Sequence, residues 1–148
     1  VALDWPPATT GPLLVGAVGP KSLALSGELS DGTIMTGGTT PDQVRAARAI
    51  VDASAAAAGR PDHPIVVFLI AATGPGAEAR LARELAAWDS TSDQLAGVAG
   101  DAQAIAAAVR ELAEAGADTV VLQPTEDEPD VESFVAFAAQ DVATLLGG

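Results

Sequence analysis

The stretch LLVGAVGPKSLALSGELSDGTIMTGG, residues 13–38, decides the fold of this 148-residue chain. It opens with a short apolar run, turns sharply at residues 16–19, and continues with Pro20, a residue suited to the first position of a helix. Asp31 and Gly32 then lead into a second apolar run. The pattern predicts a strand, a tight glycine turn, a helix and a second strand, which together make a βαβ unit.

The same alternation continues along the rest of the chain. Strands are predicted at residues 13–18, 33–36, 65–72 and 119–123. The third, IVVFLIAA, is apolar throughout, as expected for a parallel strand covered on both faces. Four consecutive βα units predict an α/β protein whose parallel sheet has right-handed crossovers. Half of a TIM-type β/α barrel and a small doubly wound, flavodoxin-like sheet both fit this pattern, and periodicity does not separate them.

Start and stop signals delimit the helices. Thr40, Pro41 and Gln43 supply an N-cap, a first-turn proline and a capping box, and Gly59 ends that helix. The inward-facing residues predicted for the later helices are Leu81, Leu85 and Trp88; then Ile105, Val109 and Leu112 between Asp101 and Gly116; and, after Asp130, Val131, Phe134, Val135, Ala138, Val142 and Leu145. Residues 90–100 predict a loop and residues 1–11 an irregular N-terminal segment, within one domain of residues 1–148.

Composition excludes several classes of function. The chain has no cysteine and a single histidine, which rules out disulfides, thiolate metal sites and an imidazole-rich metal centre. Only seven lysines and arginines accompany twenty acidic residues, and the net charge of −13 argues against nucleic-acid binding. No apolar run reaches the roughly 18 residues of a membrane span, and the N-terminus lacks the basic region of a secretory signal. We expect a cytoplasmic protein without nucleic-acid or membrane partners.

The first glycine turn is the strongest candidate for ligand binding. Active sites of β/α barrels lie at the carboxyl ends of the strands, and this turn follows the first strand. The N–H groups of Ala17, Val18 and Gly19, together with the following helix N-terminus, are predicted to hold a phosphate. Lys21 and Ser22 would add side-chain donors. The alternative is a plain βα turn in which glycine only permits the backbone angles.

The end of the second strand is the next candidate. Thr36, Gly37 and Thr39 are predicted to line the substrate or the tail of a cofactor. The alternative is a purely structural role, in which Thr39 and Thr40 cap the following helix.

Other polar residues receive structural interpretations. His63 precedes the third strand, at the opposite end from a barrel active site, and is predicted to lie in a surface loop. Glu126, Asp127 and Glu128 follow the last strand at the correct end, but prolines bracket them and a solvated acidic loop is predicted. No residue is assigned a catalytic role.

The turn and its helix also resemble a known family. Residues 15–21, VGAVGPK, and 26–32, SGELSDG, resemble the second half of the luciferase-like flavin and deazaflavin oxidoreductases, which are eight-stranded β/α barrels. Residues 58–61, AGRP, and 112–122, LAEAGADTVVL, extend the resemblance over nearly the whole chain. On this basis the chain is similar to strands five to eight of such a barrel.

The resemblance implies an oxidoreductase or monooxygenase that transfers hydride through FMN or coenzyme F-420. The family uses the small, glycine-containing turn against the cofactor phosphate, here residues 17–22. Much of the substrate pocket, and the residues that contact the cofactor ring, come from the N-terminal half of the family's barrel. Thr39 stands where some sugar-phosphate-oxidising relatives have a basic residue, which argues against a phosphorylated sugar as the small-molecule substrate.

A half-barrel raises the question of partners. It would have two unpaired strand edges and an apolar inner face, features that promote association. We expect it to pair with a missing N-terminal half or with a second copy. The alternative function is a non-catalytic, self-associating half-barrel or flavodoxin-like module that binds no redox cofactor. A phosphosugar isomerase ranks last, because Lys21 is the only lysine or histidine at a strand end.

Overall fold

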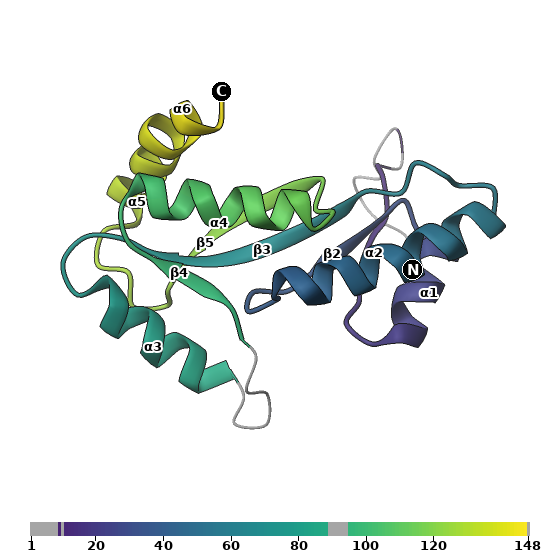
Figure 1. Ribbon diagram of the computed structural model, residues 1–148, viewed down its shortest axis with the longest axis horizontal. Coiled ribbons are helices and arrows are strands. Elements are labelled where there is room, and N and C mark those ends of the chain that lie inside the picture. Colours follow the sequence, from purple (N-terminus) through teal and green to yellow (C-terminus); the bar gives the residue numbers. More distant parts are fainter. Residues whose placement is uncertain (1–8, 10, 89–94, 148) are drawn as a thin grey trace, which may run out of the picture.

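Parallel strands alternate with helices throughout the part of the chain that the structure describes (Figure 1). The structure is a computed structural model, and it describes residues 9, 11–88 and 95–147. The strands are β1 (Leu14–Gly16), β2 (Gly32–Met35), β3 (Ile65–Ala72), β4 (Gly97–Ala99) and β5 (Thr119–Pro124). The helices are α1 (Pro20–Leu29), α2 (Pro41–Ala57), α3 (Ala77–Trp88), α4 (Ala102–Glu114), α5 (Val131–Phe137), a π-helical turn (Ala138–Val142) and α6 (Ala143–Leu146).

The central strand of the sheet is β3. Residues 65–67 pair with β2 and residues 70–72 with β4, and β1 pairs with the far side of β2. On its other edge, residues 66–71 of β3 pair with β5. Every one of these pairings is parallel. The predicted α/β fold with a parallel sheet of consecutive βα units is confirmed, and β1, β4 and β5 each pair with a single strand of the described sheet.

The strand β4 is the main difference from the predicted elements. The loop predicted at residues 90–100 contains this strand, whereas residues 90–94 of that prediction lie outside the described residues. Three residues are too few to display an alternating pattern, so pairing with the end of β3 defines the strand. An isolated bridge between Gly38 and Ala96 adds to it. The predicted irregular segment 1–11 lies mostly outside the described residues.

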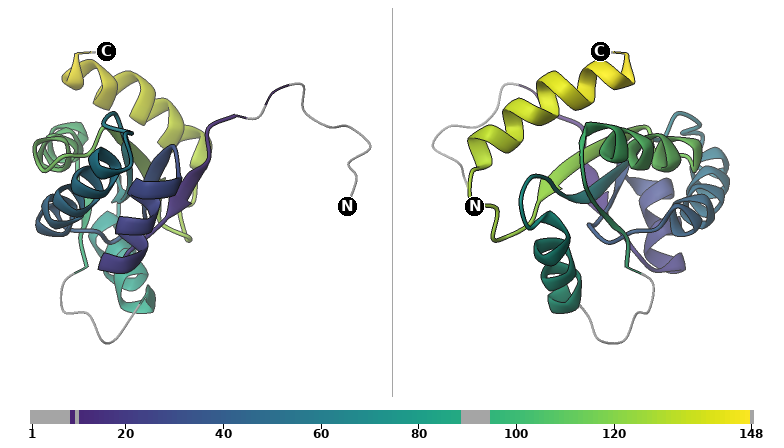
Figure 2. Two further views of the ribbon diagram at one scale, coloured as in Figure 1. Left: turned by 90° about the vertical axis from the view of Figure 1, so that its right-hand side faces the viewer. Right: turned by 60° about the vertical axis from the view of Figure 1, so that its left-hand side comes forward.

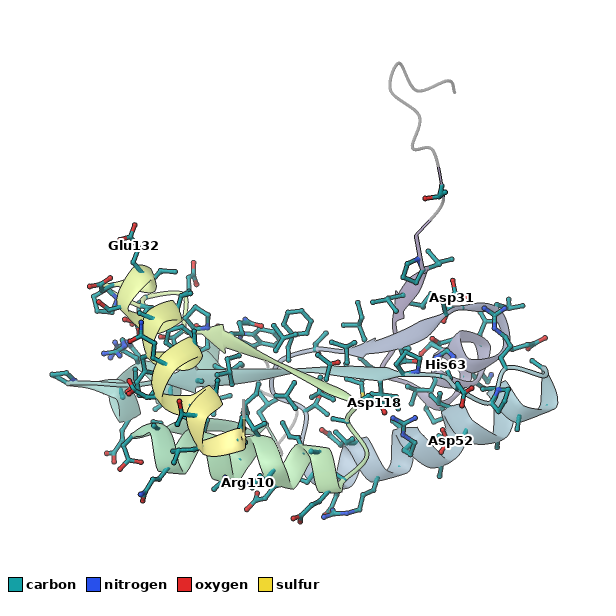
Figure 3. All side chains as sticks on the ribbon, turned by 90° about the horizontal axis from the view of Figure 1, so that it is seen from above. Asp31, Asp52, His63, Arg110, Asp118 and Glu132 are labelled. Carbon is teal, nitrogen blue, oxygen red and sulfur yellow. The ribbon has the colours of Figure 1, made fainter. Side chains whose placement is uncertain are left out.

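Alternation along β3 assigns its side chains to two faces of the sheet. Ile65, Val67 and Leu69 are buried in the main core, together with residues of α2 and α4. Figure 3 shows α2 and α4 along that same face. Ile70 points the opposite way, towards α3, and is fully buried, whereas Phe68 on that opposite face is only half-buried.

The predicted helix caps are confirmed. Thr40 and Gln43 form a reciprocal capping box at the start of α2, with Pro41 in the first position. Asp101 accepts from the Ala104 amide at 2.9 Å, and Asp130 accepts from the Ser133 amide at 3.0 Å. Gly59 has a φ of +74° just after α2, the left-handed conformation expected of a helix-ending glycine.

The predicted apolar stripe of the last helix is only partly correct. Phe134 and Val142 are buried against α4, but Val131, Val135 and Leu145 are exposed. A π-helical turn at residues 138–142 shifts the helical periodicity within the stripe.

Candidate functional site

The turn between β1 and α1 presents uncapped backbone amides. Gly19 is the N-cap of α1, with φ −83° and ψ 156°, and no side chain caps this helix. Pro20 follows, and the first turn contains no acidic residue. Among the described residues, no protein acceptor meets the amides of Val18, Gly19, Lys21 or Ser22. Such amides and the positive end of the helix dipole are the elements of an anion site.

Ala17 differs from its neighbours in this turn. Its N–H donates to the Ile34 carbonyl at 3.1 Å and so continues the pairing of β1 with β2. Its side chain is buried. The Ala17 amide is therefore engaged within the sheet, and the amides without an acceptor among the described residues begin at Val18.

Two polar side chains follow the turn. The Ser22 hydroxyl donates to the Gly19 carbonyl at 2.9 Å, which keeps this hydroxyl beside the turn. Lys21 is exposed and makes no salt bridge within the described part of the chain. The turn therefore combines a helix N-terminus with a lysine, although the chain as a whole is strongly acidic.

A small cavity lies between the first turns of α1 and α2. Its volume is about 160 Å³, and its lining is mostly apolar. The structure brings Ala17 and Val18, predicted to bind the cofactor, to the same cavity as Thr39, predicted to bind the substrate. Drug-sized ligands occupy cavities of roughly 300–1,000 Å³, so this space suits one chemical group and not a whole cofactor.

The end of β2 holds the remaining predicted residues. Thr36 is exposed, and its carbonyl accepts from the Thr39 hydroxyl at 2.7 Å. Gly37 is buried, and it has no room for a side chain. A side-chain carbon there would lie 2.8 Å from Ile70 Cγ1 and 3.3 Å from Trp88 Cη2. Gly37 thus permits close packing, whereas the Thr36 side chain faces open space.

The helix α3 is held at the carboxyl ends of β3 and β5 by a buried ion pair. The side chains of Arg80 and Glu128 are 9% and 7% exposed, and they are 3.2 Å apart. Arg80 also donates to the carbonyls of Thr73 at 2.6 Å and Pro75 at 2.7 Å. The prediction that Glu128 belongs to a solvated acidic loop is wrong. Arg80, from a helix distant in the sequence, neutralises Glu128, and nothing in the neighbouring sequence predicts that contact.

Two further contacts connect α3 to the segment after β5. Arg83 donates to Asp127 at 2.6 Å, and this hydrogen bond is the main reason why the pKa of Asp127 lies below its ordinary value. Glu84 accepts the Glu126 amide at 3.0 Å. The carboxylates at this end of the sheet are therefore largely engaged with arginines and amides.

The position of Trp88 also differs from the prediction. The sequence predicts an inward-facing residue, yet Trp88 is 40% exposed. Its Nε1 donates to Glu84 Oε1 at 2.9 Å, and its ring edge lies against Gly37 at the end of β2. Helical spacing identified the apolar stripe of α3, but only the tertiary structure shows that the stripe is no longer covered by the sheet at Trp88.

A comparison with protein families identifies the chain. A family model described as luciferase-like monooxygenase matches residues 1–128. The chain belongs to the luciferase-like monooxygenase family. The resemblance found in the sequence is thus confirmed, although a search of curated proteins gives no significant match.

Solved structures similar to this luciferase-like chain share its fold. A coenzyme F-420-dependent tetrahydromethanopterin reductase from Methanopyrus kandleri is 19% identical, with a TM-score of 0.71 over 90% of this chain and 50% of the reductase. An F-420-dependent secondary alcohol dehydrogenase, in complex with an F-420–acetone adduct, is 16% identical, with a TM-score of 0.76 over 94% of this chain and 50% of its own. DmoA from Hyphomicrobium sulfonivorans is 14% identical, with a TM-score of 0.60 over 90% and 41%.

The luciferase-like chain therefore spans about half the length of the structures it matches. Its fold corresponds to part of a β/α barrel. Within the described residues, no cluster of three or more histidine, cysteine or acidic side chains is arranged to hold a metal ion, and no helix is long and apolar enough to cross a membrane.

The amino end of the sheet carries a second polar region. An open cavity of about 740 Å³ lies there, lined by His63, Arg48, Asp52 and Asp118 among others (Figure 3). Arg48 donates to the Gly116 carbonyl at 3.0 Å and the His63 carbonyl at 2.9 Å, so it joins three segments of the fold. This end of a barrel serves stability, and the larger cavity is not the candidate active site.

The prediction that His63 lies at the surface is wrong. The residue is 5% exposed, and its Nε2 is 2.9 Å from the Thr33 hydroxyl. That hydroxyl is 2.8 Å from the Ser26 hydroxyl, which is in turn 2.9 Å from that of Ser30. Burial, followed by the positive charges of Arg48 and Arg60, lowers the pKa of His63. A chain of buried hydroxyls has no signature in sequence, because its members come from α1, β2 and the segment before β3.

Proposed function

We propose that this chain forms the part of a luciferase-like oxidoreductase that binds the cofactor phosphate at the β1–α1 turn. The single observation that carries the proposal is the uncapped N-terminus of α1, where the amides of residues 18, 19, 21 and 22 have no acceptor among the described residues. Lys21 would supply the only positive side chain of the turn, and Ser22 a hydroxyl. Ala17 would contribute to the cavity wall through its side chain.

The proposed cofactor is coenzyme F-420 or FMN, and the reaction a hydride transfer or monooxygenation. Membership of the luciferase-like family supports this class, as do structural relatives whose names state coenzyme F-420 dependence. Both cofactors carry a phosphate on a flexible polar tail, the group that a helix N-terminus suits. The cofactor would supply the redox chemistry, and the chain would bind and orient it.

Thr36 and Thr39 are the proposed contacts to the substrate or the cofactor tail. The exposed Thr36 side chain lies at the carboxyl end of β2, and Thr39 reaches the cavity shared with the first turn. Gly37 would act indirectly, by allowing Trp88 to approach the sheet. No described residue is proposed as a catalytic acid or base.

We further propose that activity requires a partner which completes the barrel. The first and last βα units lie at opposite ends of the molecule (Figure 1, Figure 2), and β1 and β5 each have one unpaired edge. Exposed apolar side chains gather in these same units, for example Leu13 and Leu29 at 62% and 61%, and Val131 and Val135 at 53% and 58%. An N-terminal half of the barrel, or a second copy of the chain, would cover both flanks.

Substitution of Gly19 tests the phosphate site. A side-chain carbon at Gly19 would meet only Ser22 Oγ, at 3.8 Å, and the backbone angles suit any residue. The carboxylate introduced by Gly19→Asp would cap α1 and oppose a phosphate, whereas Gly19→Asn would cap without charge. We expect Gly19→Asp to weaken FMN and coenzyme F-420 binding by at least tenfold, and Gly19→Asn by much less, in fluorescence titrations of the purified chain.

Equal affinities for Gly19→Asp and the unaltered chain would place the phosphate elsewhere. Flat titrations with both cofactors, combined with a dimeric mass, would favour the alternative of a self-associating half-barrel without a redox cofactor. The exposed apolar side chains of the first and the last βα unit are the observation that favours this alternative.

A further inference from the structure

Trp88 is an exposed aromatic residue that lies outside the first and the last βα unit. The other large apolar side chains exposed within the described residues belong to the first or the last βα unit: Leu13, Leu14, Val18, Leu25, Leu29, Val131, Val135, Leu145 and Leu146. Trp88 lies in neither unit, at the end of α3. Its exposure is therefore separate in position from the apolar side chains of those two units.

The indole of Trp88 is held in a defined orientation. Its Nε1 donates to Glu84 at 2.9 Å, and its Cη2 lies against the backbone of Gly37. Glu84 is itself fixed, because its second carboxylate oxygen accepts the Glu126 amide at 3.0 Å. Since its only polar atom is already satisfied, the exposed part of the side chain is the apolar ring.

The helix that carries Trp88 is anchored at the carboxyl ends of the strands. Arg80 and Arg83 bind Glu128 and Asp127, the residues that follow β5. Trp88 then contacts the residue that comes after the exposed Thr36. An oriented aromatic ring thus lies at the carboxyl end of β2, the strand that pairs with β1.

We propose that Trp88 is a stacking wall for the planar aromatic ring of a ligand bound at this end of the sheet. Aromatic rings stack in offset or edge-to-face arrangements, and such pairs contribute free energy beyond their buried area. A wall that is already oriented loses little conformational entropy on binding. The proposal rests on the proposed function, and it adds a ring contact from this half of the barrel to the phosphate contact at Gly19.

Riboflavin and FMN are suitable probes, because they share one ring system and only FMN carries a phosphate. The chain contains two tryptophans, Trp5 and Trp88, so Trp5→Phe leaves Trp88 as the only indole. We expect riboflavin and FMN to quench its emission saturably, and inorganic phosphate to leave it unchanged. In titrations followed by flavin fluorescence, Trp88→Ala should lower the affinity for both flavins by about tenfold, and Trp88→Phe should lower it by about twofold. Leu29→Ala, which removes an exposed apolar side chain from the flank, should have no effect.

The outcomes separate this proposal from the phosphate site. If Gly19→Asp weakens FMN binding and Trp88→Ala does not, the proposed stacking role of Trp88 is wrong and the proposed phosphate site is supported. If Trp88→Ala weakens the binding of both flavins and Gly19→Asp weakens the binding of neither, the stacking role is supported and the proposed phosphate site is wrong. Failure of both flavins to bind the folded chain would overturn both proposals, and equal losses for Trp88→Ala and Leu29→Ala would overturn the wall.

Discussion

The first and the last βα connections of the described sheet both follow the carboxyl ends of their strands but differ in their free hydrogen-bonding capacity. After β1, no side chain caps the N-terminus of α1. After β5, Glu128 and Asp127 bind arginines of α3, and the Glu126 amide binds Glu84. In the sequence, both connections follow the carboxyl end of a predicted strand. In the structure, the first keeps backbone amides without an acceptor among the described residues, whereas the Thr125 hydroxyl is the buried side-chain group of the last that has no partner there.

This difference separates a site from a structural contact. Position at the carboxyl ends of parallel strands is shared by both connections, so position alone does not decide function. Buried polar groups that already have partners stabilise the fold, whereas outward-facing amides without partners can bind an anion. The four predictions below test this difference, in decreasing order of expected effect.

Loss of Arg80 should have the largest effect on stability. Arg80→Met would leave Glu128 buried without its partner, and breaking such a pair costs about 3–5 kcal/mol. Urea unfolding should show a loss of this size in the free energy of unfolding. The double variant Arg80→Met/Glu128→Gln should recover a substantial part, because no carboxylate is then left unpaired. Equal losses for the single and the double variant would contradict a coupled pair.

Lowering the pH should weaken the fold through His63. Its folded-state pKa is lowered by burial and then by Arg48 and Arg60, so folding favours the neutral ring. Its contribution is therefore complete above the unfolded pKa of about 6.5, and it decreases as the pH falls from there towards the folded pKa. Thermal unfolding between pH 7.5 and 5 should show this decrease. His63 is the only histidine, so His63→Gln should flatten the curve over this range.

Arg83 should contribute far less to stability than Arg80, although both bind carboxylates after β5. The side chains of Arg83 and Asp127 are 63% and 45% exposed, and solvent screening leaves such exposed pairs with little effect on stability. Arg83→Gln should nevertheless raise the pKa of Asp127 towards its ordinary value, since this hydrogen bond is its main perturbation. NMR titration measures the pKa, and urea unfolding the stability. A stability loss equal to that of Arg80→Met would remove the distinction between the two pairs.

A new cap on α1 should have the smallest effect on stability. Gly19→Asn would add a side-chain cap at a position where none exists, and replacement of glycine by such a residue gains a few tenths of a kcal/mol. A small upward shift in the unfolding midpoint, measured beside Gly19→Ala as the uncapped control, is the expected result. A marked destabilisation would mean that the turn has no room for a side chain.

The sequence predicted those features of the fold that depend on neighbouring residues. The strand at residues 65–72 has the predicted limits, because eight consecutive apolar residues identify a strand buried on both faces. The capping box at Thr40 and the ends marked by Gly59 and Asp130 were predictable because their geometry is local. The glycine turn after the first strand was recognised for the same reason.

Features built from distant segments were not predictable. The strand β4 is too short to show a pattern, and its pairing with β3 defines it. Burial of His63 depends on hydroxyls from α1 and β2, and burial of Glu128 on an arginine 48 residues away in the chain. The exposure of Trp88 at the rim also depends on where α3 lies over the sheet.

By itself, then, the sequence determined the order of the strands and helices other than β4, their caps, the family resemblance and the candidate turn at residues 17–22. These follow from apolar periodicity and turn chemistry, which act over a few residues. The tertiary structure alone decided which polar groups have partners. It engages the Ala17 amide and the acidic residues after β5, and leaves the amides from Val18 onward uncapped. The physical reason is that a hydrogen bond or ion pair between distant segments exists only after the chain has packed.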